Sequence, residues 1–386
     1  MEILESLRSI QFWRMAVLWT LALICSKLQQ FIRKWSHGGT STYRRDSISP
    51  PFQGALPLPV CVITGVSLSS LPIFKLIIMF TLDFKLLKAT SGLGREAALA
   101  LSFHGFYVVL TGRSSLLLSQ TIEEIRKQNP DANLKAFKLD VTSFESVSLF
   151  KDSLENWLIE SDMNCSIQVL INNAGILATS GRLTGDGHDE MMATNYLCPF
   201  FLTKVLLPLL QKSPSGSKIV NVSSFTHQNV FNLQVDKETV TGVRFHGFNQ
   251  YPYAQIYEYS KVFVLLFTYH LHRELIEKDE SSKISVIAVD PGAVATKILR
   301  EFPPQISSLA HFVLKFIGLM QSPTMGISSL LDAVLAPPEA SGQYFFGGDG
   351  RTLNSSALSC NKKLAEQLWQ ISCSLFLEST RLQKDK

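Results

Sequence analysis

Short apolar runs rich in β-branched residues alternate with longer helical patterns along most of this chain. Strands are predicted at Val60–Thr64, Tyr107–Thr111, Leu134–Leu139, Ile167–Ile171, Lys218–Val222, Lys283–Val289 and Gln343–Phe346. Helical patterns include Leu93–Phe103, Glu145–Leu158, Glu190–Leu210, Tyr253–Glu277, Gln305–Met320 and Asn361–Leu377. Continuous apolar strands are typical of a parallel sheet covered on both faces. The sequence therefore predicts a three-layer α/β/α fold with about seven mostly parallel strands.

Composition excludes several classes of function. Hydrophobic residues make up 46% of the chain, which is ample for a large core. The net charge is only +4, and no block of lysine and arginine points to nucleic acid. The six cysteines show neither a CxxC pair nor a Cys/His ligand spacing. We therefore expect no disulfides and no metal site, in a reducing compartment.

The N-terminal segment, residues 1–36, differs from the rest. Its run Phe12–Cys25 is mostly apolar with basic flanks, and its tryptophans at 13, 19 and 35 suit a membrane interface. The run is shorter than the roughly 20 apolar residues of a spanning helix. We expect membrane association, followed by a linker over 37–59; the alternative is an amphipathic extension packed on the domain.

A glycine-rich turn of the kind that binds phosphate is divided between two places. Thr64-Gly65 ends the first strand, whereas Ser91-Gly92-Leu93-Gly94 opens the first helix. Such glycines allow a tight turn and let a pyrophosphate approach the N-terminus of a helix. If residues 66–88 are removed, the halves join as TGATSGLG. The two halves together thus predict a dinucleotide site.

The stretch 66–88 that divides this turn is rich in Leu, Ile, Phe and Ser. Thymine-rich codons encode such residues, and its first valine and last lysine fit the ends of an intron. We interpret it as a retained intron or a gene-model error; the alternative is a genuine lineage-specific loop. Lengthening a loop costs only about 1–2 kcal/mol of chain entropy, so we expect the domain to fold. Because the phosphate turn is split, we expect reduced affinity for the cofactor.

Residues after the second and third strands indicate which dinucleotide binds. Arg113 stands about 20 residues after the glycine turn, where a carboxylate favours NAD and an arginine pairs with a 2′-phosphate. We therefore predict NADP(H), with a solvated loop arginine as the alternative reading. Asp140 and Val141 close the third strand, where they can contact adenine. Asp140 can equally cap the next helix.

The ends of the fourth and sixth strands carry small residues and turn formers. At the carboxyl edge of a parallel sheet, such residues let the nicotinamide end of a dinucleotide lie against the backbone. Asparagines in such a place can also be simple turn formers. After the sixth strand a Pro-Gly turn redirects the backbone, and a threonine can bind the carboxamide. The predicted residues are Asn172, Ala174, Gly175, Pro291, Gly292 and Thr296.

Tyr257 and Lys261 stand four residues apart and so share one helical face. A nearby ammonium favours the phenolate, so we expect Lys261 to let Tyr257 exchange a proton with an alcohol or carbonyl oxygen. Ser224 can hold that oxygen, with Ser223 as a turn residue, although the two serines can exchange roles. Asn195 is either the holder of a water that links Lys261 to solvent or a simple buried asparagine.

In this order and at these strand ends, the motifs over about residues 60–346 resemble the short-chain dehydrogenase/reductase (SDR) family. The resemblance implies one Rossmann-type domain, placed at 60–350, with a C-terminal helical extension over 351–386. It implies hydride transfer between an alcohol/carbonyl pair and NADP(H), with NAD(H) as an alternative. Asn195, Ser224, Tyr257 and Lys261 match the family's catalytic tetrad.

Within the family, Ile219–His227 and the wide gap from Ser224 to Tyr257 resemble the retinol-dehydrogenase-like branch. Tyr257–Leu271 and the turn after the sixth strand are most similar to the type named SDR family member on chromosome X and its plant relatives. This implies an apolar alcohol or aldehyde, such as a retinoid, steroid or polyisoprenoid, presented at the endoplasmic reticulum or another organelle membrane.

The same resemblance puts a substrate-binding flap at Phe302–Met320. We further expect the catalytic domain on the cytosolic side of the membrane, and a homodimer is an open alternative to a monomer. The apolar residues of that segment also fit plain core packing. The rival prediction is a catalytically impaired SDR-fold isoform or binding protein, because the insertion splits the glycine turn.

Overall fold

The computed structural model describes residues 10–36, 58–66, 92–278, 283–348 and 350–384. Seven parallel strands form one sheet in the order β3-β2-β1-β4-β5-β6-β7. Each predicted strand is present, with ends moved by one or two residues. The strands are β1 Val60–Ile63, β2 Tyr107–Gly112, β3 Leu134–Lys138, β4 Val169–Asn172, β5 Ser217–Val222, β6 Ile284–Asp290 and β7 Tyr344–Phe346.

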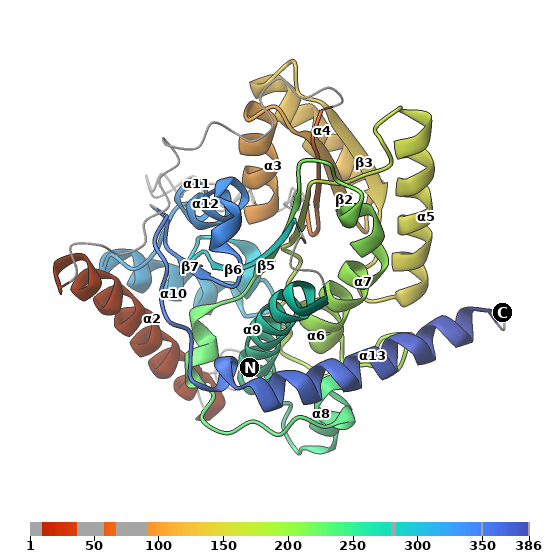
Figure 1. Cartoon of the computed structure of the whole chain (residues 1–386). Helices are drawn as coiled ribbons and strands as arrows, with labels where there is room; N and C mark the ends of the chain where they lie inside the picture. Colours follow the sequence, from red (N-terminus) through yellow and green to blue (C-terminus); the bar gives the residue numbers. More distant parts are fainter. Residues whose placement is uncertain (1–9, 37–57, 67–91, 279–282, 349, 385–386) are drawn as a thin grey trace.

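Helices cover both faces of this sheet, which confirms the predicted three-layer α/β/α fold (Figure 1). One face packs on α5, α7 and α9, and the other packs on α3, α4 and α12. The helices are α2 Ile10–Ser36, α3 Leu93–Phe103, α4 Ser115–Gln128, α5 Phe144–Glu160, α6 Glu190–Met192, α7 Cys198–Gln211, α8 Lys237–Thr241, α9 Tyr253–Lys278, α10 Pro304–Phe316, α11 Pro323–Gly326, α12 Ser328–Leu335 and α13 Lys362–Lys384. Short helical turns are η3 Ala193–Leu197, η4 Phe225–Asn229, η5 Val243–Gly247, η6 Lys297–Leu299, η7 Pro338–Ala340 and η8 Leu358–Cys360.

The strand order reverses at β1, whose neighbours are β2 and β4. In open parallel sheets, ligands bind in the crevice beyond the carboxyl ends of the strands at this switch point. The sequence order of the elements thus places the residues after β1, β2, β4, β5 and β6 around one opening.

The predicted helix over Glu190–Leu210 is not a single regular helix. It starts as α6, continues through the π-helical turn η3 and ends as α7. A π turn inserts one extra residue per turn and re-aims the side chains around it. It therefore decides where Asn195, in the middle of η3, points.

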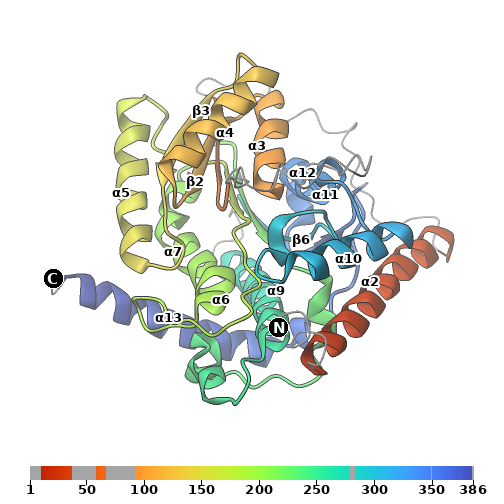
Figure 2. The same cartoon turned by 180° about the vertical axis from the view of Figure 1, so that it is seen from behind.

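The N-terminal helix α2 packs on η4 and α9 (Figure 2). Among the described residues two helices are long and apolar enough to cross a membrane, Gln11–Ile32 and Glu190–Gln211. The second is mostly buried, as a core helix is. The first extends beyond the apolar run Phe12–Cys25 and lies near the N-terminus.

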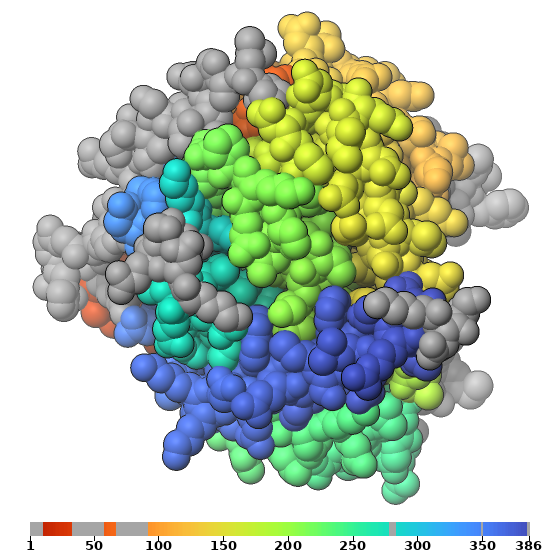
Figure 3. Space-filling view, turned by 45° about the vertical axis from the view of Figure 1, so that its right-hand side comes forward, coloured from red at the N-terminus to blue at the C-terminus, as the bar shows by residue number. Residues whose placement is uncertain are grey.

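The C-terminal helix α13 lies along the surface of the domain (Figure 3). It packs on α9 and α8. Tyr196 Oη and Ser372 Oγ, both fully buried, are 2.6 Å apart and joined by a hydrogen bond. This helix therefore completes the packing of one face, and it extends beyond the predicted range to Lys384.

Candidate functional site

A cavity of about 670 Å³ opens at the carboxyl edge of the sheet, at the switch point. Its walls come from the ends of β1, β2, β4, β5 and β6, from α9, and from the segment that contains α10. Most of the sequence-predicted site residues line it: Gly65, Gly92, Leu93, Arg113, Val141, Ala174, Gly175, Ser224, Tyr257, Lys261, Pro291, Gly292 and Thr296. The fold thus brings together residues spread over more than half of the chain.

The two halves of the glycine turn meet at this cavity. Gly65 has a φ of +71°, and a Cβ there would lie 2.8 Å from the Cα of Ala174. A Cβ on Gly94 would lie 2.8 Å from Asn173 Nδ2 and 3.2 Å from the Gly65 carbonyl oxygen. Side chains are thus excluded where β1, the start of α3 and the turn after β4 pack closely against one another. Ser91 lies outside the described residues.

Val66 is the first residue of the predicted atypical stretch, 66–88. Its backbone N–H donates to the Thr111 carbonyl oxygen over 3.1 Å, and its side chain is fully buried among the core residues on the α3 side of the sheet. Val66 therefore occupies a regular place after β1. The rest of the predicted atypical stretch, residues 67–88, lies outside the described part of the chain.

Thr64 organises the turn after β4 and does not line the cavity. Its Oγ1 accepts hydrogen bonds from the backbone N–H groups of Asn173 and Ala174, over 2.9 and 3.0 Å. The Asn173 side chain returns a hydrogen bond to the Thr64 carbonyl oxygen over 2.8 Å. Asn173 also lines the cavity, and sequence reasoning did not single it out.

Asn172, unlike Asn173, lies in the core and not at the cavity. Its Nδ2 donates to Thr203 Oγ1 and Asn221 Oδ1, over 3.1 and 2.8 Å, inside the core. Asn172 is 3% exposed and is absent from the cavity lining. Its side chain ties β4 to β5 and α7, so any effect on a cofactor runs through the position of the following residues.

Arg113 and Val141 lie at the end of the cavity nearest β2 and β3. Arg113 is exposed there, whereas Asp140 is outside the lining. The Asp140 carboxylate accepts hydrogen bonds from the backbone N–H and the hydroxyl of Thr142. The N-cap of α5 is Ser143, which corrects the alternative that Asp140 caps that helix.

Ser224, Tyr257 and Lys261 converge on the opposite end of the cavity. Lys261 Nζ lies 5.4 Å from the centre of the Tyr257 ring and donates to the Val222 carbonyl oxygen over 3.1 Å. Ser223 Oγ instead donates to the Lys261 carbonyl oxygen over 3.0 Å. Ser223 thus fastens β5 to α9, while Ser224 leads into η4 with its hydroxyl beside the tyrosine.

Burial dominates the electrostatics of this group. It raises the pKa of the Tyr257 phenol, and the charge of Asp290 raises it further, while a hydrogen bond with the Ser224 side chain lowers it. Burial also lowers the pKa of Lys261 to about 8, against the attraction of Asp290. The expected lowering of the tyrosine pKa by Lys261 is therefore outweighed, because the whole group is withdrawn from water.

Asn195 is 1% exposed and is held on both sides of its amide. Its Oδ1 accepts from the Ile176 backbone N–H over 2.8 Å, and its Nδ2 donates to the Ile176 carbonyl oxygen and to Ser260 Oγ. A Cβ on Gly175 would lie 3.5 Å from Asn195 Oδ1 and 3.7 Å from Lys261 Nζ. Both polar groups therefore face the same point of the backbone.

Asp290, at the end of β6, is a site residue that sequence reasoning missed. It is fully buried, and it accepts from Gly292 N and Tyr344 Oη, each over 2.7 Å. Burial raises the pKa of its carboxyl to about 6, above the usual range. The available signal was an acidic residue at the buried end of a central strand, directly before the Pro-Gly turn.

Trp19 and Arg300 also line the cavity without having been assigned to it. Trp19 comes from α2, more than two hundred residues from Tyr257 in the chain. No local pattern in the sequence indicates such a contact. Arg300 brings a second cation near Arg113; burial lowers the pKa of Arg300, and the charge of Arg113 lowers it further.

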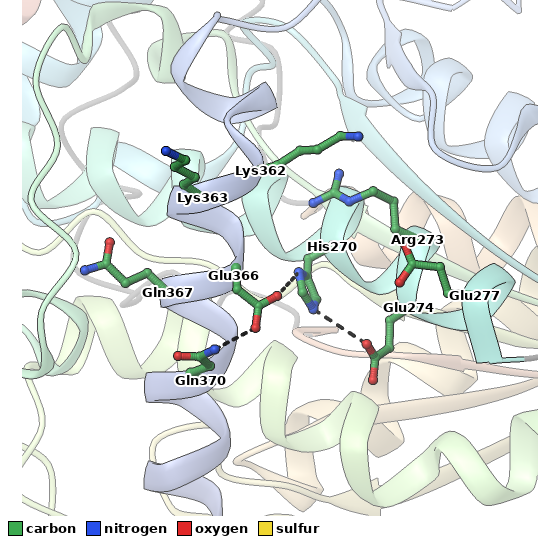
Figure 4. Close-up of a pocket in the computed structure, with 9 residues that line it drawn as sticks. All are labelled: His270, Arg273, Glu274, Glu277, Lys362, Lys363, Glu366, Gln367 and Gln370. Atoms are coloured by element: carbon green, nitrogen blue, oxygen red, sulfur yellow. Dashed lines mark hydrogen bonds and ion pairs between the residues drawn. The ribbon is translucent and has the colours of Figure 1, made fainter.

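A second crevice lies between α9 and α13 (Figure 4). His270 stands there between Glu366 and Glu274, with N–O distances of 3.7 and 3.9 Å. The other lining residues are Arg273, Glu277, Lys362, Lys363, Gln367 and Gln370. Its acids and bases stand opposite one another, and none of the nine lining residues belongs to the predicted site. We therefore place the candidate site in the larger cavity.

Comparison with known proteins gives matches over most of the chain. A family model described as short chain dehydrogenase matches residues 87–235, starting just before the second half of the glycine turn. Human polyprenol dehydrogenase is 30% identical over 292 residues, which cover 74% of this chain and 82% of the relative. Retinol dehydrogenase 12 of Mus musculus is 31% identical over 293 residues, which cover 74% and 84%.

A solved structure supports the fold independently. The actinorhodin polyketide ketoreductase, in a structure determined with NADPH, aligns with a TM-score of 0.50 at 22% identity. The alignment covers 76% of this chain and 97% of the ketoreductase. At this level of identity the likeness establishes the architecture.

Proposed function

This chain belongs to the short-chain dehydrogenase/reductase family of oxidoreductases, and on that premise we propose that it interconverts an apolar alcohol and its aldehyde or ketone with NADP(H). The observation that carries the proposal is the convergence of Ser224, Tyr257 and Lys261 on the cavity that also holds the glycine turn. A proton-transfer group and a dinucleotide cradle in one cavity are what hydride transfer to a carbonyl requires.

The cavity fits a nicotinamide dinucleotide. Gly65 and Gly92 line the cavity at the N-terminus of α3, where a pyrophosphate would lie, and Gly94 lets α3 pack closely on the turn after β1. Arg113 stands where a 2′-phosphate would be recognised. Ala174, Gly175 and the Pro291-Gly292 turn would hold the nicotinamide end. When bound, the cofactor supplies or accepts the hydride. NADP(H) is favoured over NAD(H) because the charge after β2 is positive.

The proton is handled by side chains of this chain. Tyr257 gives its phenolic proton to the oxygen of a carbonyl, or takes one from an alcohol, while Ser224 holds that oxygen beside it. Because burial raises the pKa of Tyr257, the phenol is protonated at neutral pH and is ready to donate. Lys261 would return a proton from solvent to Tyr257 through a water held near Asn195, whose amide Oδ1 and the Lys261 Nζ both lie close to Gly175.

Two surface elements support an apolar substrate that arrives from a membrane. Helix α10 exposes Leu309, Phe312, Val313 and Phe316, and its residues His311 and Leu314 line the cavity. Helix α2 exposes Val17, Leu21, Leu28, Phe31 and Ile32 on the side away from the domain. We infer that both faces enter the interface of an organelle membrane, with the catalytic domain on its cytosolic side.

The alternative is an SDR-fold isoform that binds ligand without turnover. The observation in its favour is the stretch between Val66 and Gly92, which separates two parts of the glycine cradle in the sequence. Under this alternative the same cavity takes the apolar ligand, but the dinucleotide binds weakly.

Turnover measurements test the proposal. With NADPH and all-trans-retinal as probes, Tyr257→Phe should lower kcat by at least about 10²-fold, because general acid–base catalysis is lost.

Arg113→Ala should raise the KM for NADPH about tenfold and leave the KM for NADH nearly unchanged. Equal activity of wild type and Tyr257→Phe would refute the assignment. A folded wild type with neither turnover nor NADPH binding would favour the alternative.

A further inference from the structure

Glu258 is a buried carboxylate that follows Tyr257 directly in α9. Its side chain is only 1% exposed. One oxygen accepts a hydrogen bond from Trp19 Nε1 over 2.8 Å, and the other forms an ion pair with Arg14 Nη2 over 2.8 Å. Both partners come from the N-terminal helix α2. A buried charge needs such partners. Glu258 therefore binds α2 to α9 directly beside the catalytic tyrosine.

The indole that binds Glu258 also contacts Tyr257. The Trp19 and Tyr257 rings have centroids 5.2 Å apart and planes tilted by 37°. Trp19 lines the cavity, and Tyr257 is 8% exposed. The Trp19 indole therefore covers the Tyr257 ring, and the hydrogen bond from Trp19 Nε1 to Glu258 fixes the orientation of the indole.

The other residues on the inner face of α2 also pack on the domain or form hydrogen bonds with it. Met15, Ala22 and Leu23 are buried. Ser26 Oγ accepts from Gln228 Nε2 in η4, and Gln30 Nε2 donates to the Phe346 carbonyl oxygen at the end of β7, each over 3.1 Å. These contacts extend over four turns of the helix. A helix that left the domain to span a bilayer would give them up, together with both partners of Glu258.

We propose that α2 is a wall of the active site and that Trp19, oriented by Glu258, positions Tyr257 and narrows the substrate pocket. The inference rests on the proposed function, since it assigns Tyr257 the proton transfer. It extends the role of the N-terminal segment from membrane association to the chemistry itself. Loss of the wall admits water to Tyr257, and because burial holds its pKa high, hydration moves that pKa down.

The kinetic test uses the full chain in detergent micelles with NADPH, and with all-trans-retinal and hexanal as probes. Trp19→Ala should lower kcat/KM for retinal about tenfold and affect hexanal less, because the lost wall contacts a long apolar chain. The limb of the kcat–pH profile that reports Tyr257 should move to lower pH by about one unit. Trp19→Phe keeps a ring against Tyr257. It should therefore retain most of the wild-type kcat/KM for retinal and most of the wild-type position of the pH limb. A purely structural role would lower the amount of active protein without moving that limb or the ratio of substrates.

A second measurement does not need turnover. Amide hydrogen exchange of the full chain, without cofactor, should show about tenfold faster exchange in α2 for Glu258→Gln, because the ion pair with Arg14 is lost. Gln29→Ala changes an exposed residue of the same helix and should leave exchange and the pH profile unchanged. If the wild type has no turnover, the proposed function fails and the exchange arm still decides the docking. Unchanged exchange in Glu258→Gln, or an unmoved pH limb in an active Trp19→Ala, would overturn the inference.

Discussion

At the scale of single residues, the site is a buried cluster of groups that perturb one another. Asp290, Lys261 and Tyr257 are each withdrawn from water, and burial is the largest cause of the pKa change at all three. Asp290 is held by Tyr344 and Gly292, so its position does not depend on Lys261. It therefore acts as a fixed negative charge once it ionises.

Asp290→Asn tests this role through a pH profile. Asp290 ionises above its pKa of about 6, and its charge then raises the pKa of both Tyr257 and Lys261. Removing that charge should move the Tyr257 limb of the kcat–pH profile to lower pH by about half a unit to one unit. Wild type and variant should converge below about pH 6, where the carboxyl is protonated.

The matched control is Asp189→Asn. Asp189 is also fully buried, but its carboxylate serves Tyr251 and His246 and the start of α6. It should lower stability without moving the limb. A limb that stays in place in Asp290→Asn would contradict the electrostatic role.

At the scale of elements, the outward faces of α2 and α10 carry apolar side chains that the fold does not use. In α10 the rings of Phe312 and Phe316 stack with centroids 6.3 Å apart, and Phe316 is 82% exposed. The same helix borders the cavity through His311 and Leu314. The predicted flap is therefore neither plain core nor polar surface, and its outer face suits insertion into an interface.

Phe312→Ser/Phe316→Ser should weaken binding to phosphatidylcholine vesicles. Burial of one phenylalanine is worth about 1.5–3 kcal/mol, so two losses predict at least a tenfold lower partition coefficient in a co-sedimentation assay. Leu149→Ser/Ile159→Ser removes two apolar residues, 61% and 62% exposed, from α5, on the far side of the domain (Figure 1). This control should bind as the wild type does. Equal loss in both variants would mean that vesicle binding is unspecific.

At the scale of the whole molecule, the split glycine turn does not prevent the SDR domain from assembling. Gly65 and Val66 lie at the end of β1, Gly94 lies in α3, and the gap between them is closed by the packing of the sheet against that helix. Folding energy from the whole domain therefore holds the cradle together. A short turn between Val66 and α3 would hold the same glycine cradle at a lower cost in chain entropy than the present long connection does.

Deletion of residues 67–89 tests the effect on cofactor affinity. It retains Val66, which the core uses, and joins the halves as TGVTSGLG. Shortening the connection is worth about 1–2 kcal/mol, so NADPH should bind about tenfold more tightly in a fluorescence titration. Gln29→Ala, a change of an exposed residue of α2, is the control and should leave the affinity unchanged. Equal affinities of the full chain and the 67–89 deletion would refute the hypothesis that the stretch weakens cofactor binding.

The sequence by itself determined the architecture and which strand-end residues share one cavity. Apolar periodicity predicted all seven strands, because a strand buried on both faces must be apolar throughout. Strand ends in a parallel sheet gather at one edge, so residues such as Gly175, Ser224 and Pro291 could be assigned to one cavity before any contact was known. These are consequences of local pattern and of a topology that follows from it.

Tertiary structure alone decided what depends on distant packing. Trp19 reaches Tyr257 from the far N-terminus, and the π turn at Asn195 sets the direction of that amide. Burial reversed the expected pKa shift of Tyr257, because desolvation depends on everything that surrounds a group and not on the lysine four residues away. Contacts over long sequence separation and the exclusion of water have no local signature, so only the folded chain shows them.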